Sequence, residues 1–90
     1  MSQPNYSVYM IRTRENKLYT GVSNDVGRRF KEHVANGAKT AKALRGKGPL
    51  ELVFVSVVGS RNDALRVEAQ IKKKSKSEKE QMIEQAITLA

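Results

Sequence analysis

The sequence contains no cysteine, which excludes disulfides, thiolate metal sites and thiol nucleophiles. It also has no apolar run long enough to cross a bilayer, and we expect neither a signal peptide nor a membrane anchor. These absences predict a cytoplasmic protein without a membrane partner. Acidic residues are scarce too, since nine Asp and Glu stand against 17 Lys and Arg, for a formal net charge of +8. Such a bias favours a polyanionic partner, and nucleic acid is the first candidate.

Ninety residues with 39% hydrophobic and 29% charged side chains indicate one globular domain over residues 1–90. We expect Met1–Asn5 to form a loosely ordered tail. The basic residues are unevenly distributed. They concentrate between Arg28 and Lys47 and again between Lys72 and Lys76.

Hydrophobic periodicity predicts a chain of short strands and helices joined by polar loops. In order these are strands 6–13 and 17–22, a helix 25–35, a short helical turn 41–44, a strand 50–58, and helices 61–74 and 78–89. The two first strands form an antiparallel hairpin. The order β-β-α-(short α)-β-α-α indicates an α+β domain in which helices cover a small sheet.

Capping residues set the predicted helix ends. Asn24 or Asp25 can cap the helix at 25–35, and Ser60 can cap the helix at 61–74. Ser77 followed by Glu80 predicts a capping box for the last helix. The strand at 50–58 is apolar on both faces, which predicts that both faces are covered.

The helix at 25–35 places Val26, Phe30 and Val34 on one apolar stripe, with Arg29 and His33 together at its border. These two polar residues have two interpretations. Arg29 could extend along the surface while His33 bonds to the backbone near the helix end. Alternatively, Arg29 binds a phosphate and His33 moves a proton, since histidine titrates near neutral pH.

Glu68 interrupts the apolar face of the helix at 61–74, between Ala64 and Ile71. A buried carboxylate without a partner costs several kcal/mol, so we expect a basic side chain, a tyrosine hydroxyl or a metal ion beside it. A salt bridge at the edge of a cleft and a metal site explain the pattern equally well.

The segment 38–48 is basic and bounded by glycine. Its cations are candidates for contacts to nucleic-acid phosphates, together with Arg28 on the preceding helix. The candidates in the segment are Lys39, Lys42, Arg45 and Lys47.

Several short motifs occur in a fixed order along the chain. Val8-Tyr9-Met10 is followed by Tyr19-Thr20-Gly21, then by Arg29 and His33 four residues apart, and later by Glu68. This set resembles the GIY-YIG nuclease superfamily, and in particular its small single-domain bacterial members. The resemblance extends from about Tyr6 to Lys73. It departs from the usual pattern at Val8, which replaces a glycine, and at Thr20, which replaces an aliphatic residue.

The resemblance implies a three-stranded antiparallel sheet flanked by helices and a phosphodiesterase that uses Mg²⁺ or Mn²⁺. It implies Tyr9, Tyr19, Arg29, His33 and Glu68 as the catalytic residues, with Glu68 as the metal ligand. Arg29 would then hold the scissile phosphate. We favour Tyr19 as the base that takes the proton of water, with its pKa lowered by nearby cations, and His33 is the alternative base.

The leading hypothesis is therefore a metal-dependent endonuclease, with DNA favoured over RNA and with branched or damaged DNA in repair or recombination as the expected target. The alternative is a nucleic-acid-binding module that retains the nuclease fold with little turnover. A third class, a small basic ribosome-associated protein, explains the charge but not the inward Glu68. We expect no added DNA-binding domain, and we therefore expect the basic loop or a protein partner to select the target. The sequence does not define an oligomeric state.

Overall fold

The computed structural model describes residues 5–89, with the first strand at the centre of a three-stranded antiparallel sheet. Residues 1–4 of the predicted tail lie outside the described residues. The strands are β1 (Tyr6–Arg12), β2 (Leu18–Ser23) and β3 (Glu51–Gly59), in the spatial order β2-β1-β3. Both edges of the sheet are therefore formed by strands that pair only with β1 in the described part of the chain.

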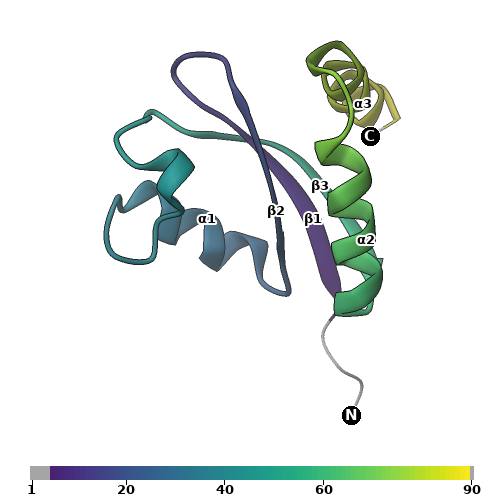
Figure 1. Cartoon of the computed structure of the whole chain (residues 1–90), viewed down its shortest axis with the longest axis horizontal. Coiled ribbons are helices and arrows are strands. Elements are labelled where there is room, and N and C mark those ends of the chain that lie inside the picture. The colour runs from purple at the N-terminus through teal and green to yellow at the C-terminus, as the bar shows by residue number, and fades with distance from the viewer. Residues whose placement is uncertain (1–4, 90) are drawn as a thin grey trace.

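The helices divide between the two faces of the sheet. They are α1 (Val26–Val34), the one-turn 3₁₀ helix η1 (Lys42–Leu44), α2 (Arg61–Lys72) and α3 (Lys76–Leu89). In Figure 1, α1 and η1 lie on one side of the strands, and α2 and α3 lie on the other. This arrangement confirms the predicted α+β class and its element order.

Two hydrophobic clusters form the core, one on each face of the sheet. Alternation along β1 sends Val8 and Met10 into the cluster that contains Ala64 of α2. Tyr9 and Ile11 point the other way, into the cluster beneath α1 and η1. All four β1 side chains are essentially inaccessible to solvent. The central strand thus holds Tyr9 rigidly on the α1 side.

An ion pair attaches α3 to the hairpin. The guanidinium of Arg12 donates to both carboxylate oxygens of Glu80, at 2.6 and 2.7 Å. This hydrogen bonding holds the pKa of Glu80 below its usual range. The last helix is therefore fixed to β1 by a bidentate contact as well as by apolar packing of Ile83.

The prediction that β3 is covered on both faces is wrong. Val55 is 47% exposed and Val57 is 66% exposed. Both residues alternate onto the same side of an edge strand. On that side, α1 and η1 pack over the β1 and β2 residues. The strand β3 is therefore covered mainly on its other face, where α2 and α3 pack.

Two of the predicted caps are confirmed and one is misplaced. Asp25 Oδ1 accepts from the backbone N–H of Arg28 at 3.1 Å, and Ser60 caps α2. The last helix, however, is capped by Ser75, whose Oγ accepts from Glu78 N while its own N–H donates to Glu78 Oε1. Ser77 is not the cap, because α3 already begins at Lys76, and Glu80 is bound to Arg12.

Candidate active site

The site begins with a close approach between β1 and β2. Tyr9 lies opposite Gly21 in the antiparallel register, and its phenol ring crosses the position where a side chain would stand. A Cβ on Gly21 would lie 2.5 Å from both Cζ and Oη of Tyr9. Glycine is therefore the residue that permits this close approach of a side chain to the strand backbone.

His33 lies beneath this ring, on the last turn of α1. It is 1% exposed, whereas Val34 is 54% exposed, so the predicted apolar stripe through Val34 is wrong. The buried face of α1 instead runs through Val26, Phe30 and His33. The helix is turned this way because His33 has polar partners inside the domain.

Those partners define the protonation of the imidazole. The backbone N–H of Ala41 lies 3.3 Å from His33 Nδ1, so Nδ1 acts as the acceptor. We therefore assign the proton of the neutral ring to Nε2, which donates to the Tyr9 hydroxyl oxygen at 3.0 Å. Burial, and after it the charge of Arg29, lowers the pKa of His33, which favours this neutral form.

Tyr19 completes a cluster of three aromatic rings. Its ring centroid lies 5.6 Å from that of His33, edge to face, and 6.4 Å from that of Tyr9. Tyr9 and His33 are each 1% exposed, but Tyr19 is only half-buried. Of the three rings, Tyr19 is thus the one that a bound molecule can touch directly.

Tyr9 is held in its protonated form. Burial, followed by the neighbouring Tyr19, raises the pKa of Tyr9 to about 12, against an opposing effect of Arg29. A phenol with this pKa stays protonated at neutral pH. Because its oxygen already accepts from His33, its own proton remains to be donated.

Arg29 acts on the ring cluster from α1, since its charge lowers the pKa of His33 and opposes the rise in the pKa of Tyr9. Its Nη1 donates to Glu32 Oε1 at 3.0 Å and to the backbone carbonyl of Lys39 at 2.7 Å. Its side chain is 30% exposed. The guanidinium is therefore oriented by two fixed acceptors while part of it still faces solvent, as a phosphate ligand requires.

Glu68 lies on α2, across the sheet from α1, and its side chain is 19% exposed. The predicted partner is present as Lys72, whose Nζ lies 3.5 Å from Glu68 Oε2. The carboxylate also acts on Tyr9, since its charge contributes to the raised pKa of that phenol. Glu68 thus influences Tyr9 electrostatically from a different layer, although less than burial, Tyr19 and Arg29 do.

The described residues contain no group of three or more potential metal ligands of the kinds His, Cys, Asp and Glu. A single half-buried carboxylate is still compatible with Mg²⁺. This ion keeps several waters and is commonly held by one or two carboxylates together with substrate phosphates. The donor set therefore fits a metal site that is completed by the substrate.

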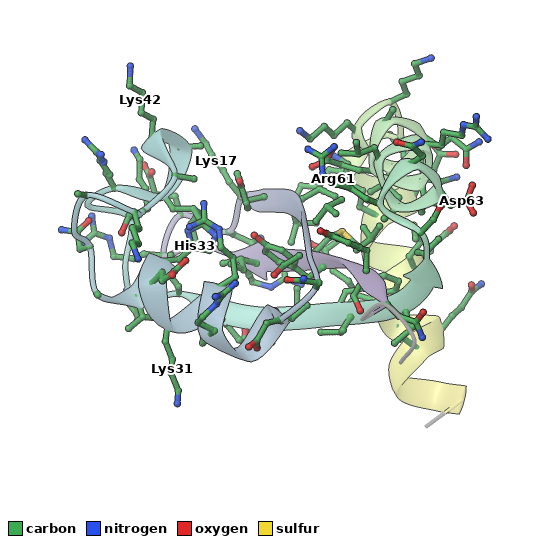
Figure 2. The ribbon with its side chains drawn as sticks, turned by 90° about the horizontal axis from the view of Figure 1, so that it is seen from below. Lys17, Lys31, His33, Lys42, Arg61 and Asp63 are labelled. Atoms are coloured by element: carbon green, nitrogen blue, oxygen red, sulfur yellow. The ribbon has the colours of Figure 1, made fainter. Side chains whose placement is uncertain are left out.

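The cations of the basic loop at 38–48 differ in whether they have partners within the protein. Arg45 bonds to the carbonyls of Thr40 and Ala38, both at 3.4 Å, and Lys47 Nζ pairs with a carboxylate of the hairpin, Glu15, at 3.2 Å. Lys42 instead extends into solvent, on the same side of the molecule as Lys17 (Figure 2).

The remaining candidate cations in this region are Lys39 and Arg28. Lys39 is 78% exposed and lies 3.8 Å from Glu32. Arg28 is exposed on α1. The outward positions of Lys39, Lys42 and Arg28 leave them available to phosphates, and their binding role stays a prediction.

Several contributors to the site were not predicted from the sequence. The Ala41 amide that orients His33 is a backbone group, so no residue type reveals it. Thr40 donates to the carbonyl of Glu32 at 2.9 Å and thereby docks the loop on the end of α1. Lys72 lies four residues after Glu68, a helical spacing that identifies it as a candidate partner.

Comparison with known proteins agrees with this architecture. The family model of the GIY-YIG catalytic domain matches residues 5–81. A UPF0213 protein of Cronobacter sakazakii is 53% identical over 76 residues, which cover 84% of this chain and 78% of the relative. The UPF0213 protein YhbQ of Escherichia coli is 51% identical over 76 residues, covering 84% and 74%.

A solved structure is also similar. The solution NMR structure of a UPF0213 protein from Bacillus halodurans has a TM-score of 0.56 and 38% sequence identity, and the match covers 89% of this chain and 83% of that one. The chain therefore belongs to the GIY-YIG catalytic-domain family and, within it, to the UPF0213 proteins. This confirms the resemblance on which the site residues were predicted. No helix within residues 5–89 has the length and apolar character needed to span a bilayer.

Proposed function

We propose that this protein is a metal-dependent endonuclease that hydrolyses phosphodiester bonds, with DNA as the favoured substrate. The observation that supports it most strongly is the convergence of Tyr9, Tyr19 and His33 into one cluster beside Arg29. A surface that only binds nucleic acid needs exposed cations, but it does not need two buried polar rings joined by a hydrogen bond.

In this proposal Arg29 binds the scissile phosphate. Its contacts to Glu32 and the Lys39 carbonyl fix the direction of the guanidinium, and its exposed part donates to phosphate oxygens. The same charge offsets the negative charge that develops on these oxygens in the transition state. The cations of the basic loop would bind phosphates further along the strand.

Tyr19 is our candidate for the general base. It is the ring accessible to a substrate, and in the phenolate form its oxygen would take the proton of the attacking water as the water oxygen bonds to phosphorus. The bond from phosphorus to the 3′ oxygen then breaks. His33 does not suit this role in the observed arrangement, because both of its ring nitrogens already have partners. Tyr9 does not suit it either, since its pKa is about 12.

Glu68 would hold the divalent cation, either Mg²⁺ or Mn²⁺. When bound, the ion supplies electrostatic stabilisation to the phosphate and to the leaving oxygen. Lys72 would neutralise Glu68 while the cation is absent. Repair or recombination of branched DNA remains the expected setting, and a protein partner could supply the choice of target.

A panel of labelled substrates tests this proposal. Duplex, single-stranded, flap and four-way-junction DNA, with the matching RNA molecules, are incubated with Mg²⁺ or with EDTA. We expect wild-type protein to cut at least one DNA substrate only with Mg²⁺, and Tyr19→Phe to be slower by at least about a hundredfold, the usual size of a base's contribution. Equal cleavage by both proteins would remove Tyr19 from the mechanism. Binding without any cleavage would support the alternative of a binding module.

A further inference from the structure

A pocket of about 160 Å³ lies beside the proposed catalytic site and has no part in the mechanism above. It opens between the β1-β2 hairpin and the loop that carries η1. The residues that line it are Thr13, Lys17, Leu18, Tyr19, Ala43 and Lys47. One wall is thus shared with the ring cluster, through Tyr19.

Both sides of the pocket are fixed by hydrogen bonds. The hairpin side is closed by the Thr13 N–H, which donates to the Lys17 carbonyl at 2.9 Å. The loop side is tied to the hairpin by the Arg14 N–H, which donates to the Lys47 carbonyl at 3.0 Å. Leu44, next to the pocket residue Ala43, is 1% exposed and anchors η1 in the core. The pocket is therefore formed before a ligand arrives.

The lining suits a flat ring that is carried on a phosphate chain. Leu18, Ala43 and the ring of Tyr19 make the interior apolar. The two ammonium groups belong to Lys17, which is exposed, and Lys47, which pairs with Glu15 at the surface. A phosphate alone would not suit the apolar interior. A nucleotide matches both parts of the pocket, because its base stacks on an aromatic side chain while its phosphates stay outside, near the cations.

We propose that this pocket receives one unpaired base of the bound nucleic acid, which stacks on Tyr19. This inference rests on the proposed nuclease function and extends it to the class of substrate. A paired base cannot leave the duplex without breaking its pairing and stacking, so an unpaired base enters at lower cost. The protein should therefore prefer nucleic acid with an unpaired nucleotide next to the cleaved bond.

Binding measurements in EDTA test this proposal without cleavage. The probes are two DNA duplexes that each carry one unpaired central nucleotide, with a base in the first duplex and an abasic residue in the second. Ala43→Leu fills the pocket from an exposed position, and thermal unfolding checks that the variant is folded. Ala35→Leu makes the same change at an exposed residue that does not line the pocket, and serves as the control.

We expect wild type and Ala35→Leu to bind the base-bearing duplex about tenfold more tightly than the abasic one, the size expected for stacking one base on an aromatic ring. Ala43→Leu should bind the two duplexes equally. Equal binding by wild type, or an unchanged preference in folded Ala43→Leu, would overturn the base pocket while leaving the nuclease proposal in place. Failure of wild type to bind any DNA would instead contradict the proposed function.

Discussion

At the scale of single residues, the site depends on the lack of a Cβ atom at Gly21. Gly21 leaves space for the phenol of Tyr9, which can then reach His33 across the hairpin. Any side chain at Gly21 would displace the hydroxyl that the imidazole holds. The glycine of the second motif is thus explained by packing against the tyrosine of the first.

Gly21→Ala tests this relationship. We expect a loss of about 1–3 kcal/mol in the free energy of unfolding, as for other overpacked sites, together with a strong loss of cleavage. Urea denaturation measures the first quantity. Gly27→Ala is the matched control, because its Cβ would meet only the Asp25 carboxylate at 3.9 Å, and alanine should stabilise α1. Equal stability of Gly21→Ala and wild type would show that Tyr9 moves without cost.

His33 provides a second prediction, on the pH dependence of stability. Its pKa is lower in the folded protein than the usual value of about 6.5 in the unfolded chain, because burial disfavours the charged ring. The unfolded state therefore binds more protons, and the stability from neutral His33 is present above pH about 6.5 and is lost as the pH falls below it.

The melting temperature measured between pH 5 and 8 checks this expectation. Wild type should lose stability toward pH 5 more steeply than His33→Gln, in which this titration is removed. Parallel curves for the two proteins would mean that His33 has the same pKa in the folded and unfolded states, which would contradict a pKa lowered by burial.

At the scale of elements, local patterns identified strands and helices better than their ends and their orientation. The alternation in β1 and the cap at Asp25 depend on neighbouring residues, so both were predictable. The rotation of α1 was not, since it depends on His33 bonding to a strand and to a loop distant in sequence. The exposure of Val57 likewise depends on which strand the helices cover.

The start of α3 gives a matched pair of substitutions. Ser75→Ala removes a side chain that accepts from Glu78 N, and should cost about 1 kcal/mol, as other N-cap replacements do. Ser77→Ala should be close to neutral, although the sequence pattern favoured that serine. Chemical denaturation of both variants measures their free energies of unfolding and shows which of the two serines caps α3. A larger loss for Ser77→Ala would place the cap where the sequence pattern put it.

At the scale of the whole molecule, charge and topology act together. The formal charge of +8 predicts a polyanionic partner, and the fold brings the η1 loop next to the ring cluster. The proposed catalytic residues come from β1, β2, α1 and α2. Their order along the chain could be matched to a family, but their contacts could not be derived from the sequence. The role of the Ala41 amide emerged only from the folded structure, whereas the spacing of Lys72 from Glu68 was a signal present in the sequence.

Binding to DNA should accordingly depend strongly on salt. Each phosphate neutralised by Lys or Arg contributes a slope of roughly −0.9 to the logarithmic dependence of affinity on salt for duplex DNA. We expect Lys42→Gln to weaken binding and reduce this slope by about one, since Lys42 extends into solvent from η1. Fluorescence anisotropy over a salt series measures the slope. An affinity that does not change with salt would exclude the basic loop as a phosphate contact.

The most direct test of the account compares cleavage and binding in Glu68→Gln, on the DNA substrate that wild type cuts. The account predicts that Mg²⁺-dependent cleavage is lost while the dissociation constant in EDTA changes by less than about threefold. Asp63→Asn, an exposed carboxylate on the same helix, should retain cleavage. If Glu68→Gln cuts like wild type, Glu68 is not the metal ligand. If it loses binding and cleavage together, the carboxylate is structural and the site is not catalytic in the way proposed.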